Sequence, residues 1–120
     1  MRKTSCATTI EGMSYTRTTA DLFDLDLARE RMDAAYQAKG LAARAVAHST
    51  NVLRSKKEEL RAIEGLGLPD DVVEAVRDKV RASRDILAQR RASFRRADAR
   101  LRRAEAYYLR LESAQLNRAA

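Results

Sequence analysis

The chain has 120 residues, with 22 alanines and 19 arginines but one proline, four glycines, two phenylalanines and no tryptophan. This composition excludes a strand-rich fold, which needs more β-branched and aromatic residues, and it limits the chain to one domain with a thin core. The net charge of +7 favours acidic partners: nucleic acid, an anionic membrane surface or an acidic protein.

Cysteine content and hydropathy indicate the compartment. Cys6 is the only cysteine, which excludes an internal disulfide or a multi-cysteine metal site and suits a reducing cytosol. Residues 4–10 are too polar for the core of a signal peptide, and no stretch reaches the about 18 apolar residues of a membrane span. We therefore expect a soluble cytoplasmic protein with no membrane span.

The first 18 residues are rich in threonine and show little periodicity. They predict a flexible N-terminal arm at 1–18, which could order on binding, followed by a helical hairpin over 19–120. Thr18 or Thr19 is the expected N-cap of the first helix, because Asp21 then lies in its first turn and favours the helix dipole.

The first helix is predicted over 20–64, a stretch with one glycine and no proline. Its residues fit a heptad pattern with two seam rows. The a row holds Leu25, Met32, Lys39, Val46, Leu53 and Leu60, and the d row holds Ala28, Ala35, Ala42, Ser49, Lys56 and Ile63.

A turn is predicted at 65–69, where the signals that stop one helix and start another coincide. Gly65 is expected to adopt the left-handed conformation that ends a helix, and Pro69 fits the first turn of the next helix. Asp70 and Asp71 then lie at the positive end of the second helix dipole.

The second helix is predicted over 70–117, where the heptad pattern continues for six repeats. Its a row holds Val73, Val80, Leu87, Phe94, Leu101 and Tyr108, and its d row holds Val76, Ser83, Arg90, Ala97, Ala104 and Leu111. Two helices of similar length joined by a short turn predict an all-α fold, an antiparallel two-helix coiled-coil hairpin.

The seam of this hairpin is rich in alanine, which buries little area per layer. Between Ala34 and Ala47 the first helix is also apolar on nearly every face. We therefore expect the hairpin to be completed by oligomerisation into a helical bundle or by packing on a partner.

Several seam and flank residues have two interpretations. Lys39, Lys56 and Arg90 either fix the register of the helices or extend their charged ends into solvent, and we favour the second. Tyr107 is expected to pack over the first helix near Phe23, with an anchor for a partner as the alternative.

Two sets of side chains are candidates for binding. A protein partner is predicted to contact the apolar set: Leu41, Ala42, Ala45, Val46, Phe23, Tyr107 and Leu109. An acidic protein or nucleic acid is predicted to contact the arginine set: Arg95, Arg96, Arg102, Arg103 and Arg110. The alternative for the arginines is a solvated face with no partner.

The sequence predicts no enzyme. No residue pattern indicates a catalytic site, a cofactor, a metal site or a small-molecule substrate. The favoured function is a protein-interaction module that acts as an adaptor, assembly factor, stalk or chaperone-like subunit, either as a homo-oligomer or in a larger complex. The alternative function is a nucleic-acid-binding or packaging protein without sequence specificity.

Overall fold

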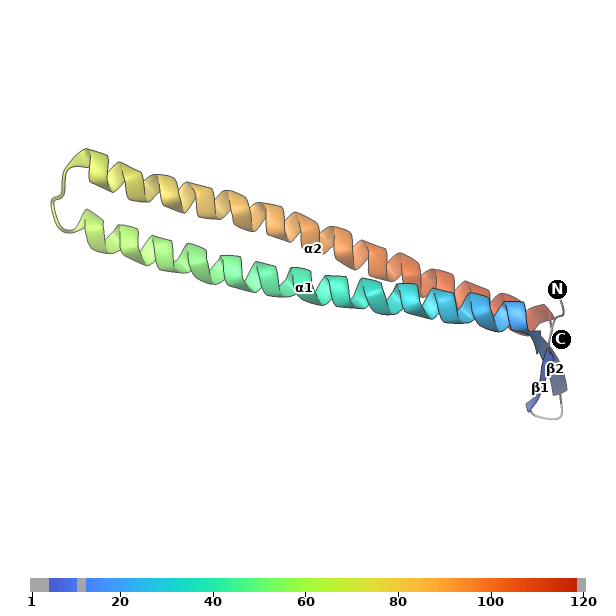
Figure 1. Cartoon of the computed structure of the whole chain (residues 1–120). Coiled ribbons are helices and arrows are strands. Elements are labelled where there is room, and N and C mark those ends of the chain that lie inside the picture. Colours follow the sequence, from blue (N-terminus) through green and yellow to red (C-terminus); the bar gives the residue numbers. More distant parts are fainter. Residues whose placement is uncertain (1–4, 11–12, 119–120) are drawn as a thin grey trace. The chain divides into compact units, whose positions relative to one another are not determined.

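The computed structural model of the chain consists mainly of two long helices that pack against each other as a hairpin (Figure 1). It describes the backbone of residues 5–10 and 13–118 and the side chains of residues 18–118. The elements in chain order are β1 (Ser5–Ile10), β2 (Met13–Thr18), α1 (Thr19–Glu64) and α2 (Asp70–Arg118). The predicted helical hairpin is confirmed, and each helix extends one residue beyond its predicted bound at one end.

The two strands lie where the sequence predicts a flexible arm. β1 and β2 pair antiparallel, with Ser5 opposite Thr18 and Ile10 opposite Met13. The threonines of this segment favour extended backbone. The strands were not predicted because the two six-residue segments show little of the alternation of apolar and polar residues that marks a half-buried strand. The described part of the arm is therefore an antiparallel ribbon, and residues 1–4 and 11–12 lie outside the described residues.

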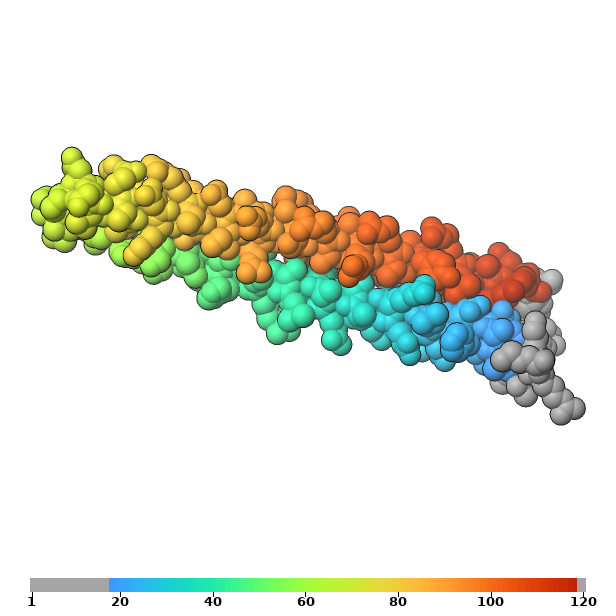
Figure 2. Space-filling model, turned by 45° about the horizontal axis from the view of Figure 1, so that its top comes forward, coloured from blue at the N-terminus to red at the C-terminus, as the bar shows by residue number. Residues whose placement is uncertain are grey.

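Two compact units divide the chain. The first holds Met1–Gln37 and Asp98–Ala120, and the second holds Ala38–Ala97. Each unit contains a stretch of α1 and an antiparallel stretch of α2. The space-filling view shows side chains of the two helices in contact within each unit (Figure 2). Each unit therefore has a seam of its own.

In the first unit the predicted seam positions are the buried ones. Leu25, Ala28 and Ala35 of α1 are buried, as is Leu101 of α2. Gln115 continues the a row of α2 and is also buried. Leucine and alanine layers alternate here, so the helices are close but the buried apolar area per turn is small.

In the second unit the core lies mainly on α2. Val76, Val80 and Leu87 are buried, and the two buried serines, Ser49 and Ser83, belong to the d rows. The seam residues that α1 adds are only half-buried, apart from Ser49. The heptad pattern therefore predicts the seam correctly, but the seam is thin.

The turn between the helices differs from the prediction in one residue. Gly67, and not Gly65, has the left-handed backbone conformation, with φ of 66°. The prediction for Gly65 is therefore wrong, because a hydrogen bond from the Leu66 N–H to the Ile63 carbonyl continues a helical turn past it. The Pro69 carbonyl accepts hydrogen bonds from the N–H groups of Val72 and Val73, which starts α2.

The hairpin buries few large apolar side chains. Among the described residues, seven apolar side chains are buried, two of them alanines, while eleven large hydrophobic ones are exposed. None of the large side chains described is completely buried. Because burial of apolar surface is the main force that stabilises a folded chain, an isolated hairpin of this kind has a small margin of stability.

A pair of leucine substitutions tests the seam of the first unit. Leu101 is 7% exposed, and Leu109, further along α2, is 59% exposed. We expect Leu101→Ala to lower the free energy of unfolding by about 2–3 kcal/mol because it leaves a cavity in the seam. The matched control Leu109→Ala should change it by less than about 0.5 kcal/mol. Urea denaturation followed by circular dichroism measures both, and equal losses would contradict this packing.

Candidate partner-binding surfaces

Asp21 joins the start of α1 to the end of α2 in the first unit. Its N–H donates to the Thr18 hydroxyl at 3.1 Å, and its carboxylate accepts from the Thr18 N–H at 3.4 Å. This reciprocal pair is an N-terminal capping box, with Thr18 as the N-cap. From α2, the Arg118 guanidinium donates to the same carboxylate at 3.0 Å. Thr18 was one of the two predicted caps, while the contact with Arg118 was not predicted.

Gln115 makes a second connection between the helix ends. Its side-chain N–H donates to the Asp21 carbonyl at 2.9 Å, and its Oε1 is buried without a hydrogen-bond partner among the described residues. A polar side chain at a seam position fixes how the two helices align, at some cost in stability. Gln115 therefore helps to set the register of α2 against α1.

Tyr108 fills the seam as predicted. It is half-buried, and its hydroxyl accepts a hydrogen bond of 2.9 Å from the Arg29 guanidinium. The Arg29 Cζ also lies 5.7 Å from the centre of the Tyr108 ring, within the range of a cation–π contact. The ring thus packs in the seam while its hydroxyl reaches a charged side chain on the flank of α1.

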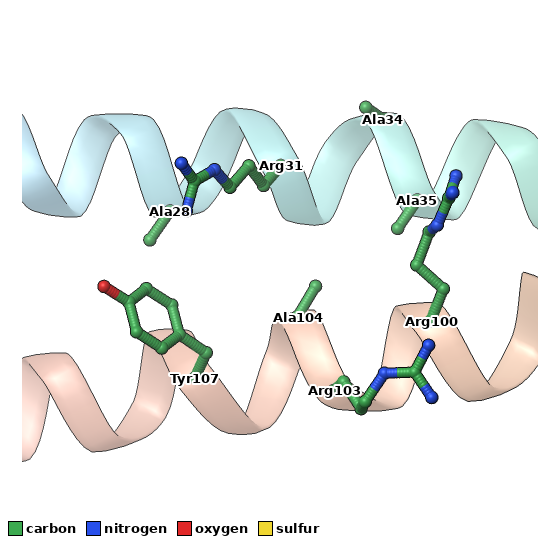
Figure 3. A pocket seen from close by; sticks show the side chains of 8 residues that line it. All are labelled: Ala28, Arg31, Ala34, Ala35, Arg100, Arg103, Ala104 and Tyr107. Carbon is green, nitrogen blue, oxygen red and sulfur yellow. The ribbon is translucent and has the colours of Figure 1, made fainter.

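A groove of about 470 Å³ runs beside this seam in the first unit (Figure 3). It exists because the seam residues there are small. Ala28 and Ala35 of α1 and Ala104 of α2 leave space that larger side chains would fill. The Tyr107 ring extends toward α1 on one side, and Arg100 reaches across from α2 beside Ala35 (Figure 3).

The rim of the groove is basic. Its lining residues include Arg31, Arg100 and Arg103 and no acidic residue. In the described part of the chain, none of these three guanidinium groups forms an ion pair. The sequence analysis singled out Arg103 but missed Arg31 and Arg100. Both occupy g positions, which lie on the same flank of an antiparallel pair. The heptad pattern could therefore have predicted that they lie on one surface.

The apolar residues predicted for a partner at the helix ends lie on the surface. Phe23 is 65% exposed, and Leu109 and Tyr107 are also exposed. Phe23 occupies an f position, opposite the seam, so it faces away from the groove that Tyr107 lines. Tyr107 extends toward α1 as expected, but it lies with Ala28 and Arg31 in the groove and not beside Phe23.

In the second unit, the apolar set divides between seam and surface. Ala42 and Val46 are half-buried at seam positions. Ala45 is half-buried on the g flank, and Leu41 is 63% exposed beyond it. Ile86 of α2 is exposed on the same g flank, although the sequence analysis did not name it. This flank of the second unit therefore carries apolar side chains that no part of the unit covers.

The charged residues at seam positions differ in exposure: Arg90 is exposed, as favoured, while Lys39 and Lys56 are half-buried. The Lys56 ammonium pairs with Glu59 at 3.4 Å. The Lys39 ammonium lies 5.9 Å from the centre of the Phe94 ring, so the seam aromatic of α2 also stabilises a cation of α1. Lys39 and Lys56 therefore each have a partner within the second unit.

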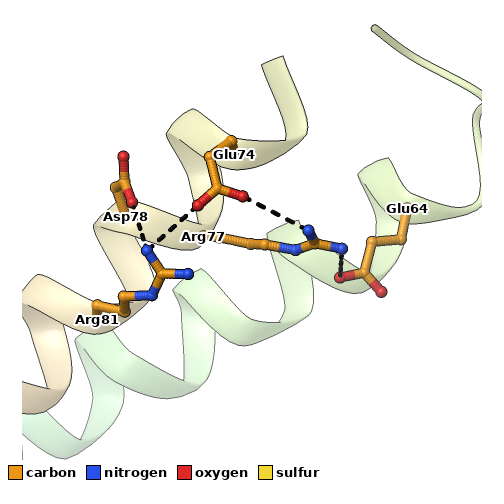
Figure 4. A network of polar contacts seen from close by, with 5 residues as sticks. All are labelled: Glu64, Glu74, Arg77, Asp78 and Arg81. Atoms are coloured by element: carbon orange, nitrogen blue, oxygen red, sulfur yellow. Dashed lines mark hydrogen bonds and ion pairs between the residues drawn. The ribbon is translucent and has the colours of Figure 1, made fainter. Parts of the chain in front are cut away.

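An ion-pair network lies beside the turn in the second unit (Figure 4). Arg77 of α2 contacts Glu64 of α1 at 3.8 Å and Glu74 at 3.5 Å. Arg81 contacts Glu74 at 3.2 Å and Asp78 at 2.9 Å. All five side chains are about half exposed, so each pair contributes about 0–1 kcal/mol. The network therefore pairs both Arg77 and Arg81 with carboxylates near the turn.

The predicted arginine set is exposed in both units. In the second unit, Arg95 is exposed and Arg96 donates to the Ser93 hydroxyl at 3.0 Å. In the first unit, Arg102 pairs with Asp98 at 3.0 Å, and Arg103 and Arg110 are also exposed. Each side chain is therefore accessible, and Arg103 is the member that borders the groove.

The contacts of Asp21 make the stability of the helix ends depend on pH. Partial burial alone would raise the pKa of this carboxyl, but hydrogen bonds from Thr18 and the charge of Arg118 hold it below the usual 3.8. A carboxyl with a lowered pKa stabilises the fold above its unfolded pKa, and this contribution is lost as the pH falls through its folded pKa.

We expect Asp21→Asn to melt at a lower temperature than the wild type at pH 7, and the difference should shrink below about pH 4. Asp24→Asn, in the same region of α1, controls for the loss of one negative charge. Thermal melts at several pH values provide the measurement. A difference between Asp21→Asn and the wild type that does not change with pH would contradict this role.

Two features are absent from the described residues. Among them, no group of three histidine, cysteine, aspartate or glutamate side chains could hold a metal ion. No helix in the described part is long and apolar enough to cross a bilayer. The side chain of Cys6 lies outside the described residues. Comparisons with protein-family models, curated proteins and solved structures found no match to this chain.

Proposed function

We propose that the chain is a non-enzymatic helical hairpin that serves as a protein-interaction module in the cytoplasm. It would act as an adaptor, assembly factor, stalk or chaperone-like subunit of a larger complex. The observation that supports this most is the balance of apolar side chains. Among the described residues, more large hydrophobic side chains are exposed than are buried in the seams. Such surfaces are typical of proteins that pack against other proteins.

Self-association is the simplest way to cover the exposed apolar flank of the second unit. Leu41 and Ile86 are exposed there, and Ala45 lies on the same flank as Ile86. Small residues beside large ones allow two hairpins to approach closely and interlock. A symmetric dimer would bury the same flank of both copies and give the second unit of each copy a four-helix environment.

Nucleic-acid binding is the second candidate. The exposure of Arg95 and Arg96 in one unit, and of Arg102, Arg103 and Arg110 in the other, supports it. Arginines at this density can neutralise backbone phosphates without reading sequence. Among the described residues, only a few exposed aromatic side chains are available for base stacking, so any such binding would depend strongly on salt.

A double substitution tests self-association. We expect the wild type to give a mass of at least twice the 13.5 kDa of one chain by size-exclusion chromatography with light scattering. Leu41→Glu with Ile86→Glu should give a monomer, because two carboxylates would have to be buried in the interface.

The matched control is Leu66→Glu, a change at a turn leucine that is 68% exposed and should leave the mass unchanged. A wild-type chain that stays monomeric, folded and stable would contradict self-association. Absorbance at 260 nm is recorded in the same run. An excess at 260 nm that disappears in high salt would instead favour the nucleic-acid candidate.

A further inference from the structure

The groove of the first unit combines an apolar floor with a basic rim. We propose that it binds an acidic amphipathic helix of a different protein. The apolar stripe of that helix would cover the groove alanines, and its carboxylates would pair with Arg31, Arg100 and Arg103. This inference rests on the proposed function, because it names the kind of partner that the interaction module would take.

The floor of the groove favours a helix over an extended or irregular chain. Ala34 is exposed and Ala104 is half-buried, so their methyl groups can accept larger apolar side chains as knobs into holes, while Ala28 and Ala35 are already buried in the seam. Arg100 and Tyr107, at opposite sides of the groove, are one heptad apart on α2, which is two helical turns or about 10 Å. Two turns of a third helix laid along the seam present side chains at that spacing.

The basic rim of the groove favours a partner helix that carries negative charge. Three guanidinium groups surround the alanines, and the lining residues include no carboxylate that could balance them. Glutamates or aspartates beside the apolar stripe of a partner can form bidentate hydrogen bonds with these arginines. A lysine-rich helix would place like charges against them, which costs affinity.

Other occupants fit the groove less well. A second copy of the chain carries a net charge of +7, so the overall electrostatics oppose its approach to a basic rim. Nucleic acid could pair its phosphates with the same arginines but would leave the alanine methyl groups without apolar contact. The combination of apolar floor and basic rim therefore indicates an acidic amphipathic helix.

The test is a fluorescence-anisotropy titration of the full chain at about 150 mM salt. The probe is a labelled helical peptide of about 21 residues with a leucine stripe flanked by glutamates, and its twin carries lysine at every glutamate position. We expect the glutamate peptide to bind and the lysine peptide to bind at least about tenfold more weakly.

Variants locate the binding in the groove. Arg100→Glu with Arg103→Glu should weaken binding of the glutamate peptide by at least about tenfold. Ala104→Leu should also weaken binding of the glutamate peptide, because the larger side chain fills the groove. If Ala104→Leu disturbs the fold, Ala34→Leu fills the groove from α1 instead. The matched control, Arg95→Glu with Arg96→Glu, reverses two charges in the second unit and should change affinity by less than about twofold.

Three outcomes would overturn the proposal. The first is no binding of the glutamate peptide. The second is an equal loss in the Arg95→Glu and Arg96→Glu control, which would show attraction by overall charge alone. The third is tighter binding of a DNA duplex of about 24 base pairs that the groove charge reversal abolishes, which would identify a phosphate site.

The same titration separates this inference from the proposed function. The self-association variant, Leu41→Glu with Ile86→Glu, changes the second unit and leaves every groove residue intact. If that variant is monomeric and still binds the peptide, both proposals stand. If the wild type self-associates but does not bind the peptide, only the groove proposal fails.

Discussion

Close packing of α1 against α2 on small side chains is the constraint on which the other features depend. Ala28 and Ala35 are buried in the first unit, and Ser49 and Ser83 are buried in the second. Small seam residues bring two helices together but remove little apolar surface from water. The large apolar side chains that a thicker core would hold lie on the surface instead. The groove and the apolar flank of the second unit both follow from this choice of seam residues.

Polar contacts supply the specificity that such a thin seam lacks. At the helix ends, Asp21 accepts from Thr18 and Arg118 while its carbonyl accepts from Gln115. These contacts define which residues of α1 and α2 lie opposite each other in the first unit. In the second unit, the exposed pair of Glu64 and Arg77 links the helices beside the turn but contributes little energy. The polar contacts therefore set the alignment of the two helices, while the apolar seam supplies a small stabilising free energy.

Much of the fold was predictable because a heptad pattern depends only on the spacing of residues along a helix. Arg90 is the only one of its assigned seam positions that is exposed. Features that depend on three-dimensional detail were missed. The left-handed residue of the turn is Gly67 because the helical turn extends past Gly65. The groove was missed because its volume depends on how closely the two helices approach, and Arg31 and Arg100 line it from different helices.

The proposed self-association requires a hairpin that is incomplete alone and gains stability from a further helix. Its most direct test is the urea midpoint of unfolding, measured over a hundredfold range of protein concentration. Folding that is linked to association predicts a midpoint that rises with concentration. A midpoint that stays constant while the chain unfolds cooperatively would contradict this requirement, because the two helices would then suffice on their own.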